Sequence, residues 1–258
     1  VVMIHHFDVV SDDDYGCFSR LAYSPDALYA ALEQARDTLP GDAQSDMEGG
    51  GFIFGHGVCD MKGGAAIQMA LLERIAGNDA CEGSLMVVGV PDEEDMSAGM
   101  RAAVPALKRI GEEYGLEYVL CINSEPHQRK SPDVGVISTG SIGKLLPFVY
   151  VRGRMAHAGK ALEGLNPAGV MAEIIMRTEA APTFADSALG ESAPPPTWLF
   201  VKDDKLCYDV SMPRAIFGCM SMLTLSLSPS QVMERIRTVC VSAFNAAVNR
   251  VYLARQAC

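Results

Sequence analysis

The sequence has no long apolar run and no paired cysteines, and each absence argues against a class of protein. No apolar stretch approaches the roughly 20 residues that a membrane-spanning helix needs, and no signal-peptide pattern is recognisable. The eight cysteines are scattered without a CxxC pair or a disulfide-rich spacing. We therefore expect a cytoplasmic protein without a membrane partner, in which cysteine acts as a small buried hydrophobic residue.

Positively charged residues are fewer than negatively charged ones in this chain. Lysine and arginine number 21 against 32 aspartates and glutamates, which gives a formal net charge of -11. Such a surface repels nucleic-acid phosphates unless a local basic patch overcomes the repulsion. The short basic clusters, Arg152/Arg154 and Gln128-Arg129-Lys130, are typical of solvated loop or strand-edge charges. We therefore expect no nucleic-acid partner.

The chain does contain enough apolar sequence for a sizeable core. Its 258 residues are 49% hydrophobic, which suits one large domain or two smaller ones. Up to about residue 140, short apolar runs alternate with helical patterns, which predicts a parallel sheet with helices on both faces, a three-layer α/β/α domain. The expected strands are 1–5, 85–90 and 118–122, the expected helices are 25–36 with Ser24 as cap, 61–76, and 98–114 with a kink at Pro105, and a loop is expected at 39–57.

A different pattern follows Gly140. The order strand, helix, strand, strand, helix predicts a ferredoxin-like α+β domain that lacks its final strand. Gly140-Ser141-Ile142-Gly143 offers a flexible join, so we divide the chain into domains 1–142 and 143–258. The expected elements are strands at 144–152, 198–201 and 216–227, and helices at 166–177 and 228–253.

Polar clusters follow the ends of the predicted strands in the first domain. His6-Phe7-Asp8 follows the first strand, Pro91-Asp92-Glu93-Glu94 the second, and Asn123-Ser124-Glu125 the third. Asp60 stands at the start of a helix. Ligands bind beyond the carboxyl ends of parallel strands. Three strands therefore deliver one imidazole and several carboxylates to one edge of the sheet.

Such a cluster of carboxylates needs compensating positive charge. Converging carboxylates repel one another unless protons or cations neutralise them. Mixed nitrogen and oxygen ligands favour zinc or a similar first-row metal over calcium, which prefers oxygen alone. Two cations about 3.5–4 Å apart can share one carboxylate and activate a bridging water. The clusters therefore predict a two-metal hydrolase centre.

Taken alone, several of these residues also have ordinary structural explanations. Glu93-Glu94 could be a solvated helix start that the helix dipole favours, and Glu125 could be a surface residue of a loop. Cys59 could be a reactive thiolate, but we interpret it as a buried structural cysteine.

His5 and His6 compete for the role of ligand. They point to opposite faces of a strand, so we expect only one of them to bind metal. Asp8 stands at the offset that can accept the second ring N–H of His6 and fix its tautomer. We therefore take His6 as the ligand and leave His5 as a structural residue.

Four stretches of the first domain stand out as motifs: His6-Phe7-Asp8-Val9-Val10, Gly57-Val58-Cys59-Asp60-Met61-Lys62-Gly63-Gly64, Pro91-Asp92-Glu93-Glu94 and Ser124-Glu125-Pro126. Together they resemble metallopeptidase family M20, which includes aminoacylases, carboxypeptidase G, dipeptidases and succinyl-diaminopimelate desuccinylase. The resemblance spans nearly the whole chain. Further stretches, such as Gly143-Lys144-Leu145-Leu146-Pro147, are similar to the branch of arginine-utilisation proteins, which are predicted deacylases.

The resemblance implies a role for each matching residue. His6 and Glu125 would hold one metal ion, and Asp60 would bridge two ions. Glu94 would bind the second ion, and Glu93 would act as general base on the bridging water. The ions would be zinc, with manganese or cobalt as alternatives.

Three further residues take supporting roles in this resemblance. Asp8 would orient His6. His157 matches a lid-domain histidine that stabilises the tetrahedral oxyanion and, in family dimers, often reaches the partner's active site. Asn166 matches a lid position that helps to bind substrate. The resemblance thus implies a homodimer formed through the lid domain.

The chain departs from the family in its histidines. His56 stands where the family usually has arginine, and its role stays open. His127 stands where the family often has threonine, and we interpret it as a loop residue. The family's second metal takes another histidine from well past the lid, yet no histidine here follows His157. We therefore expect a fragment of a longer protein, truncated at both ends, that can be inactive by itself.

We expect a metal-dependent hydrolase that cleaves the amide bond of an N-acyl amino acid or a small peptide. The same resemblance suggests a role in arginine or related amino-acid catabolism. Two other classes stay open. A non-catalytic homologue would bind amino acids or peptides without stoichiometric metal. A structural lid-and-dimer module would need only residues 144–258 and would leave the strand-end carboxylates unexplained.

Overall fold

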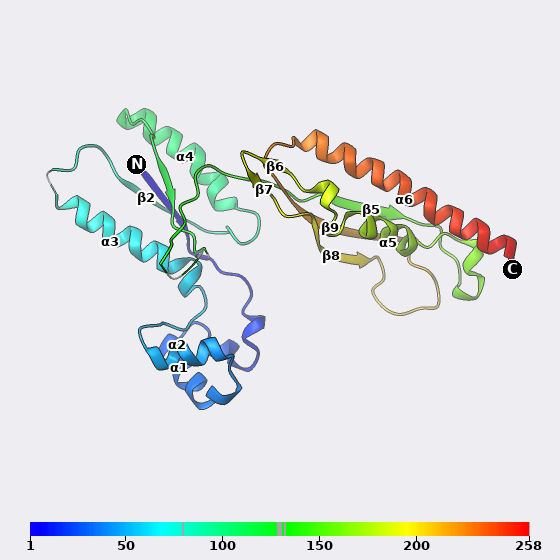
Figure 1. Ribbon diagram of the computed structural model, residues 1–258, viewed down its shortest axis with the longest axis horizontal. Helices are drawn as coiled ribbons and strands as arrows, with labels where there is room; N and C mark the ends of the chain where they lie inside the picture. Colours follow the sequence, from blue (N-terminus) through cyan, green and yellow to red (C-terminus); the bar gives the residue numbers. More distant parts are fainter. Residues whose placement is uncertain (79, 128–130, 132, 258) are drawn as a thin grey trace. The chain divides into compact units, whose positions relative to one another are not determined.

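The computed structural model describes residues 1–78, 80–127, 131 and 133–257 (Figure 1). The chain divides into two compact units, Val1–Ile137 and Ser138–Cys258. The division falls just before the segment 140–143, the join that the sequence suggests. The basic cluster at 128–130 lies outside the described residues.

The first unit is built on a parallel sheet, as the sequence predicts. The central strand β1 (Val2–His6) pairs in parallel with β2 (Met86–Val90) on one side and with β3 (Cys121–Asn123) on the other. The third strand is shorter and later than the expected 118–122. The backbone oxygen of Leu120 still accepts a hydrogen bond from the Val2 amide at 2.9 Å, so the chain runs beside β1 before β3 begins.

Helices α3 (Gly64–Ala76) and α4 (Ala98–Tyr114) cover opposite faces of this sheet. Alternate residues of β1 show the two faces. Val2 and Ile4 line a hollow together with residues of α4, whereas His5 faces α3, where its Nδ1 lies 2.9 Å from Oε1 of Gln68. The unit therefore has the predicted three-layer α/β/α order. Pro105 lies inside α4, which is a single helix.

The segment between β1 and α3 holds more helix than the sequence predicts. The expected loop at 39–57 contains α2 (Gly41–Gly49), so that prediction was wrong. Buried Met47 anchors this helix, and an ion pair between Arg36 and Glu48 ties it to the preceding turn. The other elements of the segment are η1 (Asp13–Leu21), α1 (Pro25–Gln34) and η2 (Arg36–Thr38). Ser24 is the N-cap of α1, although its side chain makes no capping hydrogen bond.

The second unit is an antiparallel sheet with two helices. The long strand β9 (Ala215–Thr224) pairs with β8 (Thr197–Asp203), and it also pairs with β4 (Gly143–Leu145) and β5 (Phe148–Arg152). The sequence predicts one strand at 144–152, but the chain breaks it at Leu146-Pro147 because proline has no N–H for the ladder. The order β-α-β-β-α is that of the predicted ferredoxin-like fold.

Helices α5 (Pro167–Thr178) and α6 (Pro229–Ala257) pack on one face of this sheet. Val149 and Val151 of β5 are buried in the core, whereas Phe148 and Tyr150 on the opposite face are exposed. The remaining short elements are η4 (Ala158–Glu163), η5 (Pro182–Phe184) and the hairpin of β6 (Ser187–Ala188) and β7 (Glu191–Ser192). Among the described residues, no helix combines the length and the apolar character needed to cross a membrane.

Candidate metal centre

His6 is the residue around which the candidate site is built. It ends β1, and only 2% of it is exposed. Its Nδ1 lies 3.1 Å from the backbone oxygen of Asp8 and 3.4 Å from Oδ1 of the same residue. Because a carbonyl oxygen can only accept a hydrogen bond, this contact assigns the ring proton to Nδ1. In the neutral ring, Nε2 then carries a lone pair.

Two carboxylates face this Nε2 atom. It lies 2.9 Å from Oδ1 of Asp60 and 3.4 Å from Oε1 of Glu125. A lone pair and carboxylate oxygens repel one another at these distances unless a proton or a cation lies between them. Imidazole that binds metal through one nitrogen, while the other donates to a carbonyl or carboxylate, is the common arrangement in metal sites. His6, Asp60 and Glu125 therefore fit a first-row divalent cation.

A second group of possible ligands shares His6. The ligand atoms of His6, Glu93 and Glu94 lie within 4.8 Å of one another, as do those of His6, Asp60 and Glu125. Glu93 and Glu94 follow β2, Glu125 follows β3, and Asp60 lies in η3 (Val58–Gly63) immediately before α3. The fold thus brings together all five residues from four separate segments.

Negative charge is in excess in this cluster. Burial has the largest effect on Glu94, followed by the negative charge of Asp60, and both raise the pKa of its carboxyl group. Burial has the largest effect on Glu125, and the Asp60 carboxylate, which can accept a hydrogen bond from protonated Glu125, also raises its pKa. Burial opposes the charged form of His6, but Asp60 and Glu125 outweigh it and raise the pKa of the imidazole. All three shifts favour retained protons, and bound cations would supply the same compensation.

Asp8 stays ionised beside this cluster. Burial opposes its charged form, but the backbone N–H groups of Glu93 and Glu94 outweigh that effect and lower its pKa. The Glu94 amide donates to Oδ2 at 3.2 Å. The buried Oδ1 has no hydrogen-bond partner in the described structure and faces Nδ1 of His6. Asp8 therefore connects His6 to the turn after β2.

A close approach of α3 to the end of β3 brings two ligand loops together. A Cβ atom at Gly64 would lie 2.2 Å from the backbone oxygen of Ser124, so the approach requires glycine. Gln68 holds it in place, because its Nε2 donates to the Ile4 oxygen at 2.6 Å and to Oγ of Ser124 at 2.7 Å. Gln68 is 1% exposed. Gln68 was not among the residues predicted from the sequence; a single amide within an apolar helical stretch is the signal that could have found it.

Asp92 shapes the turn that carries Glu93 and Glu94, a role that was not predicted from the sequence. Its φ of +66° lies in the left-handed region, which aspartate tolerates better than most residues. Its backbone oxygen accepts from the Ser97 amide at 2.6 Å, and its Oδ2 accepts from the Ala98 amide at 2.8 Å. These bonds fix the turn between β2 and α4.

The other histidines of the first unit are not members of these two groups. His5 points to the opposite face of the sheet and contacts Gln68. His56 donates from Nε2 to the backbone oxygen of Val10 at 2.8 Å. His127 is exposed and lies in no helix or strand. His5 and His127 thus occupy the structural and loop positions that the sequence suggests.

Cys59 is exposed, so its interpretation as a buried cysteine was wrong. The segment η3 departs from helical geometry at Asp60 and Met61, and only Met61 is buried there. Five of the seven described cysteines are exposed, which also contradicts the expectation that cysteine acts as a core residue in this chain.

The two predicted lid residues belong to the second unit. His157 precedes η4, and its Nδ1 accepts a hydrogen bond from the Gly159 amide at 3.0 Å. Asn166 caps α5, and its Oδ1 accepts from the Ala168 amide at 2.9 Å. Both side chains are therefore set by contacts at the start of a helix.

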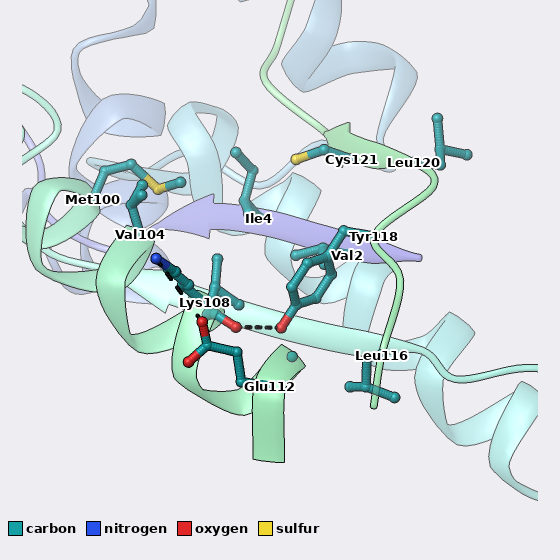
Figure 2. A pocket seen from close by; sticks show the side chains of 12 residues that line it. Val2, Ile4, Met100, Val104, Lys108, Glu112, Leu116, Tyr118, Leu120 and Cys121 are labelled. Carbon is teal, nitrogen blue, oxygen red and sulfur yellow. Dashed lines mark hydrogen bonds and ion pairs between the residues drawn. The ribbon is translucent and has the colours of Figure 1, made fainter. Parts of the chain in front are cut away.

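A hollow of about 540 Å³ lies elsewhere in the first unit, between α4 and the sheet (Figure 2). Val2, Ile4 and Val104 contribute to its apolar lining, and Tyr118 donates from its hydroxyl to the Leu107 oxygen at 2.6 Å. The residues of the metal centre do not line it. Its apolar lining offers no ligand set comparable with that around His6.

Comparison with known proteins decides the family. Residues 33–248 match the description Peptidase family M20/M25/M40. The chain belongs to this family. Uncharacterized protein YqjN of Bacillus subtilis (strain 168) is 36% identical over 238 residues, which cover 92% of this chain and 43% of YqjN. Protein RocB of the same organism is 32% identical over 213 residues, which cover 81% of this chain and 37% of RocB.

Solved structures share the fold of this chain. Human carnosine dipeptidase 1 has a TM-score of 0.57 at 15% identity, with 95% of this chain and 57% of that chain covered. This likeness agrees with the mixed α/β architecture. The chain spans less than half the length of the two curated relatives.

Proposed function

We propose that this chain carries most of a two-metal site that hydrolyses the amide bond of an N-acyl amino acid or a small peptide. The observation that supports this most directly is the position of His6, whose Nε2 faces Asp60 and Glu125 while Nδ1 is held by Asp8. Membership of the M20 family supports a peptidase or deacylase in general.

His6 and Glu125 would hold one cation, Asp60 would bridge two, and Glu94 would hold the second. Bound cations supply polarisation of the scissile carbonyl and a lowered pKa of the attacking water. Glu93, exposed at the edge of the cluster, takes the proton of that water and passes it to the leaving amine.

Two residues of the second unit complete the proposal. His157 stabilises the tetrahedral oxyanion, and loss of one such donor typically costs about 10²–10³ in rate. Asn166 helps to bind substrate. Both roles are taken from the family resemblance.

The same resemblance implies a homodimer. Phe148 and Tyr150 are exposed on the face of the sheet opposite the helices, and they offer apolar area for contact between two copies of this unit.

The narrower assignments belong to the same proposal. Zinc suits the mixed donor set, with manganese or cobalt as alternatives. The identity to RocB supports a place among arginine-utilisation proteins and a role in amino-acid catabolism. The described cysteines are free, which suits a reducing cytoplasm.

Metal analysis combined with an activity panel tests this function. The full-length protein that contains this chain should purify with close to two equivalents of zinc or manganese, or regain activity when they are added. It should hydrolyse N-acyl amino acids or dipeptides, and a chelator should abolish the reaction. A protein that binds such compounds without metal and without turnover would instead be a non-catalytic homologue.

A further inference from the structure

A hydrogen bond from His56 joins two segments of the first unit that carry candidate metal ligands. Its Nε2 lies 2.8 Å from the backbone oxygen of Val10. A carbonyl oxygen can only accept, so Nε2 carries the proton and donates. Val10 follows Asp8 closely in the sequence, and His56 stands shortly before Asp60. The bond therefore ties the segment that leaves β1 to the segment that leads to Asp60.

The segment 15–23 holds the imidazole of His56 in this orientation. The rings of Tyr15 and Tyr23 meet it edge to face, with centroids 5.2 and 5.4 Å away and interplanar angles of 75° and 72°. Aromatic rings prefer this arrangement to a face-to-face sandwich. The His56 amide also donates to the backbone oxygen of buried Ala22 at 2.7 Å. Side chain and backbone of His56 are thus both fixed before its Nε2 meets Val10.

Close packing at the neighbouring residues supports the same junction. Gly57 has a φ of +71°, and a Cβ atom there would lie 2.4 Å from Cγ1 of Val9. Glycine therefore lets the chain before η3 lie directly against the chain after β1. The bond from His56 to Val10 and the contact of Gly57 with Val9 hold the two segments at one place.

The position of Asp60 depends on the backbone of its turn. The half-exposed carboxylate of Asp60 lies beside the candidate ligands His6 and Glu125. Unprotonated imidazole and carboxylate oxygens repel it, so these neighbours hold the side chain only when a proton or a cation lies between them. The turn itself must therefore carry Asp60 to the site, and this turn begins at the junction of His56 with Val10.

We propose that His56 is a positioning residue of the metal centre: its bond to Val10 sets the distance between Asp60 and His6, and thereby the affinity for the cation that they share. His56 belongs to neither group of candidate ligands, so it acts through the turn. The inference rests on the proposed function, which makes Asp60 a bridging ligand, and it gives a role to the histidine whose role the sequence leaves open.

Two amide variants of the full-length protein test the bond itself. Glutamine places its Nε2 as many bonds from Cα as histidine does, whereas asparagine is one methylene shorter and cannot reach Val10. Calorimetric titration of the metal-free protein with zinc measures the affinity. His56→Asn should weaken zinc binding about tenfold, the lower end of the range for a residue that orients a metal ligand from outside. His56→Gln should bind zinc nearly as tightly as the wild type.

Thr38→Val is the matched control. It removes another side-chain bond to a backbone oxygen in the same unit, that of Ala35 at 2.6 Å, from an exposed position in η2. Its zinc affinity should equal that of the wild type. Denaturation of the metal-free proteins should show similar small shifts of the midpoint for Thr38→Val and His56→Asn, because each loses one hydrogen bond.

Unchanged zinc affinity in His56→Asn overturns the inference. So does an equal loss in His56→Gln, which would assign the effect to the ring and not to the bond, or an equal loss in Thr38→Val, which would assign it to stability. A His56→Asn protein that is unfolded without metal would place His56 in the fold alone and would also overturn it. A wild-type protein that binds no zinc contradicts the proposed function as well, so the two failures are distinct.

Discussion

Nε2 of His6 lies 2.9 Å from Oδ1 of Asp60, although 54 residues separate them in the sequence. His6 reaches this position from the end of a central strand, and Asp60 reaches it from the irregular turn before α3. A Cβ atom at Gly64 would overlap the Ser124 backbone, so glycine at this position lets α3, which follows Asp60, approach the end of β3. The geometry of the candidate metal centre therefore depends in part on how α3 packs against the end of β3, next to Glu125.

Glu93→Gln in the full-length protein should keep its metal and lose turnover. The substitution preserves the size of the side chain but removes the base, and general-base catalysis contributes typically about 10²–10⁴ in rate. Metal content by mass spectrometry and kcat with the preferred substrate measure the two effects. Glu113→Gln, on the exposed surface of α4, is the control. Substantial residual hydrolysis by Glu93→Gln would remove Glu93 from the role of base.

Asp8→Ala should weaken metal binding by about tenfold to a hundredfold, the usual range for an outer-sphere partner of a metal-binding histidine. The backbone oxygen of Asp8 remains to hold Nδ1 of His6, so we expect the lower end of that range. Competition with a chromophoric chelator measures the affinity. Asp13→Ala, an exposed acid in η1, should have no effect. Equal affinities for the Asp8 variant and the wild type would show that the carboxylate does not orient the ring.

Gly64→Ala should destabilise the first unit by about 1–3 kcal/mol, because the added methyl group overlaps the Ser124 backbone. Helix propensity alone would predict the opposite sign. Gly169→Ala provides the comparison, since a Cβ atom there meets nothing within 4 Å, and it should be neutral or stabilising. Chemical denaturation followed by circular dichroism measures both. Metal affinity should fall for Gly64→Ala alone.

Low pH should remove the stabilisation that the ionised side chain of Asp186 gives to the second unit. The Ser226 hydroxyl and the backbone amides of 225–227 donate to this carboxylate, and these bonds hold its pKa well below the usual range. The pKa of Asp186 is lower in the folded protein than in the unfolded chain, where it is about 3.9. The stabilisation is therefore complete above the unfolded pKa and is lost as the pH falls through the folded pKa.

Asp186→Asn tests this contribution. The difference in the free energy of unfolding between wild type and variant should be large at pH 7 and should shrink progressively below about pH 4. Trp198, the single tryptophan of the chain, lies in β8, so its fluorescence reports unfolding of the second unit. A difference that does not change with pH would mean that the charge of Asp186 is unimportant.

The layers and the convergence of the candidate ligand residues could be predicted because both follow from short-range patterns. Apolar runs mark β1 and β2, and polar residues at their carboxyl ends converge wherever strands are parallel. His6 could be preferred over His5 because side chains alternate along a strand. These features need no knowledge of distant contacts.

The missed features depend on contacts between distant segments. Helix α2 has a weak helical sequence and is held by Met47 and by Arg36 from the preceding turn. Gln68 gains its role only when α3 meets β1 and the end of β3. The exposure of Cys59 follows from the irregular geometry of η3. Composition and spacing do not contain this information.

Both ends of the Gln68 amide are already occupied by groups of the protein: Oε1 contacts His5, and Nε2 donates to Ile4 and Ser124. The frame around the candidate ligands is therefore held by hydrogen bonds within the protein itself. Ion capture should then proceed without backbone rearrangement, at a speed governed by how quickly the hydrated cation sheds its water.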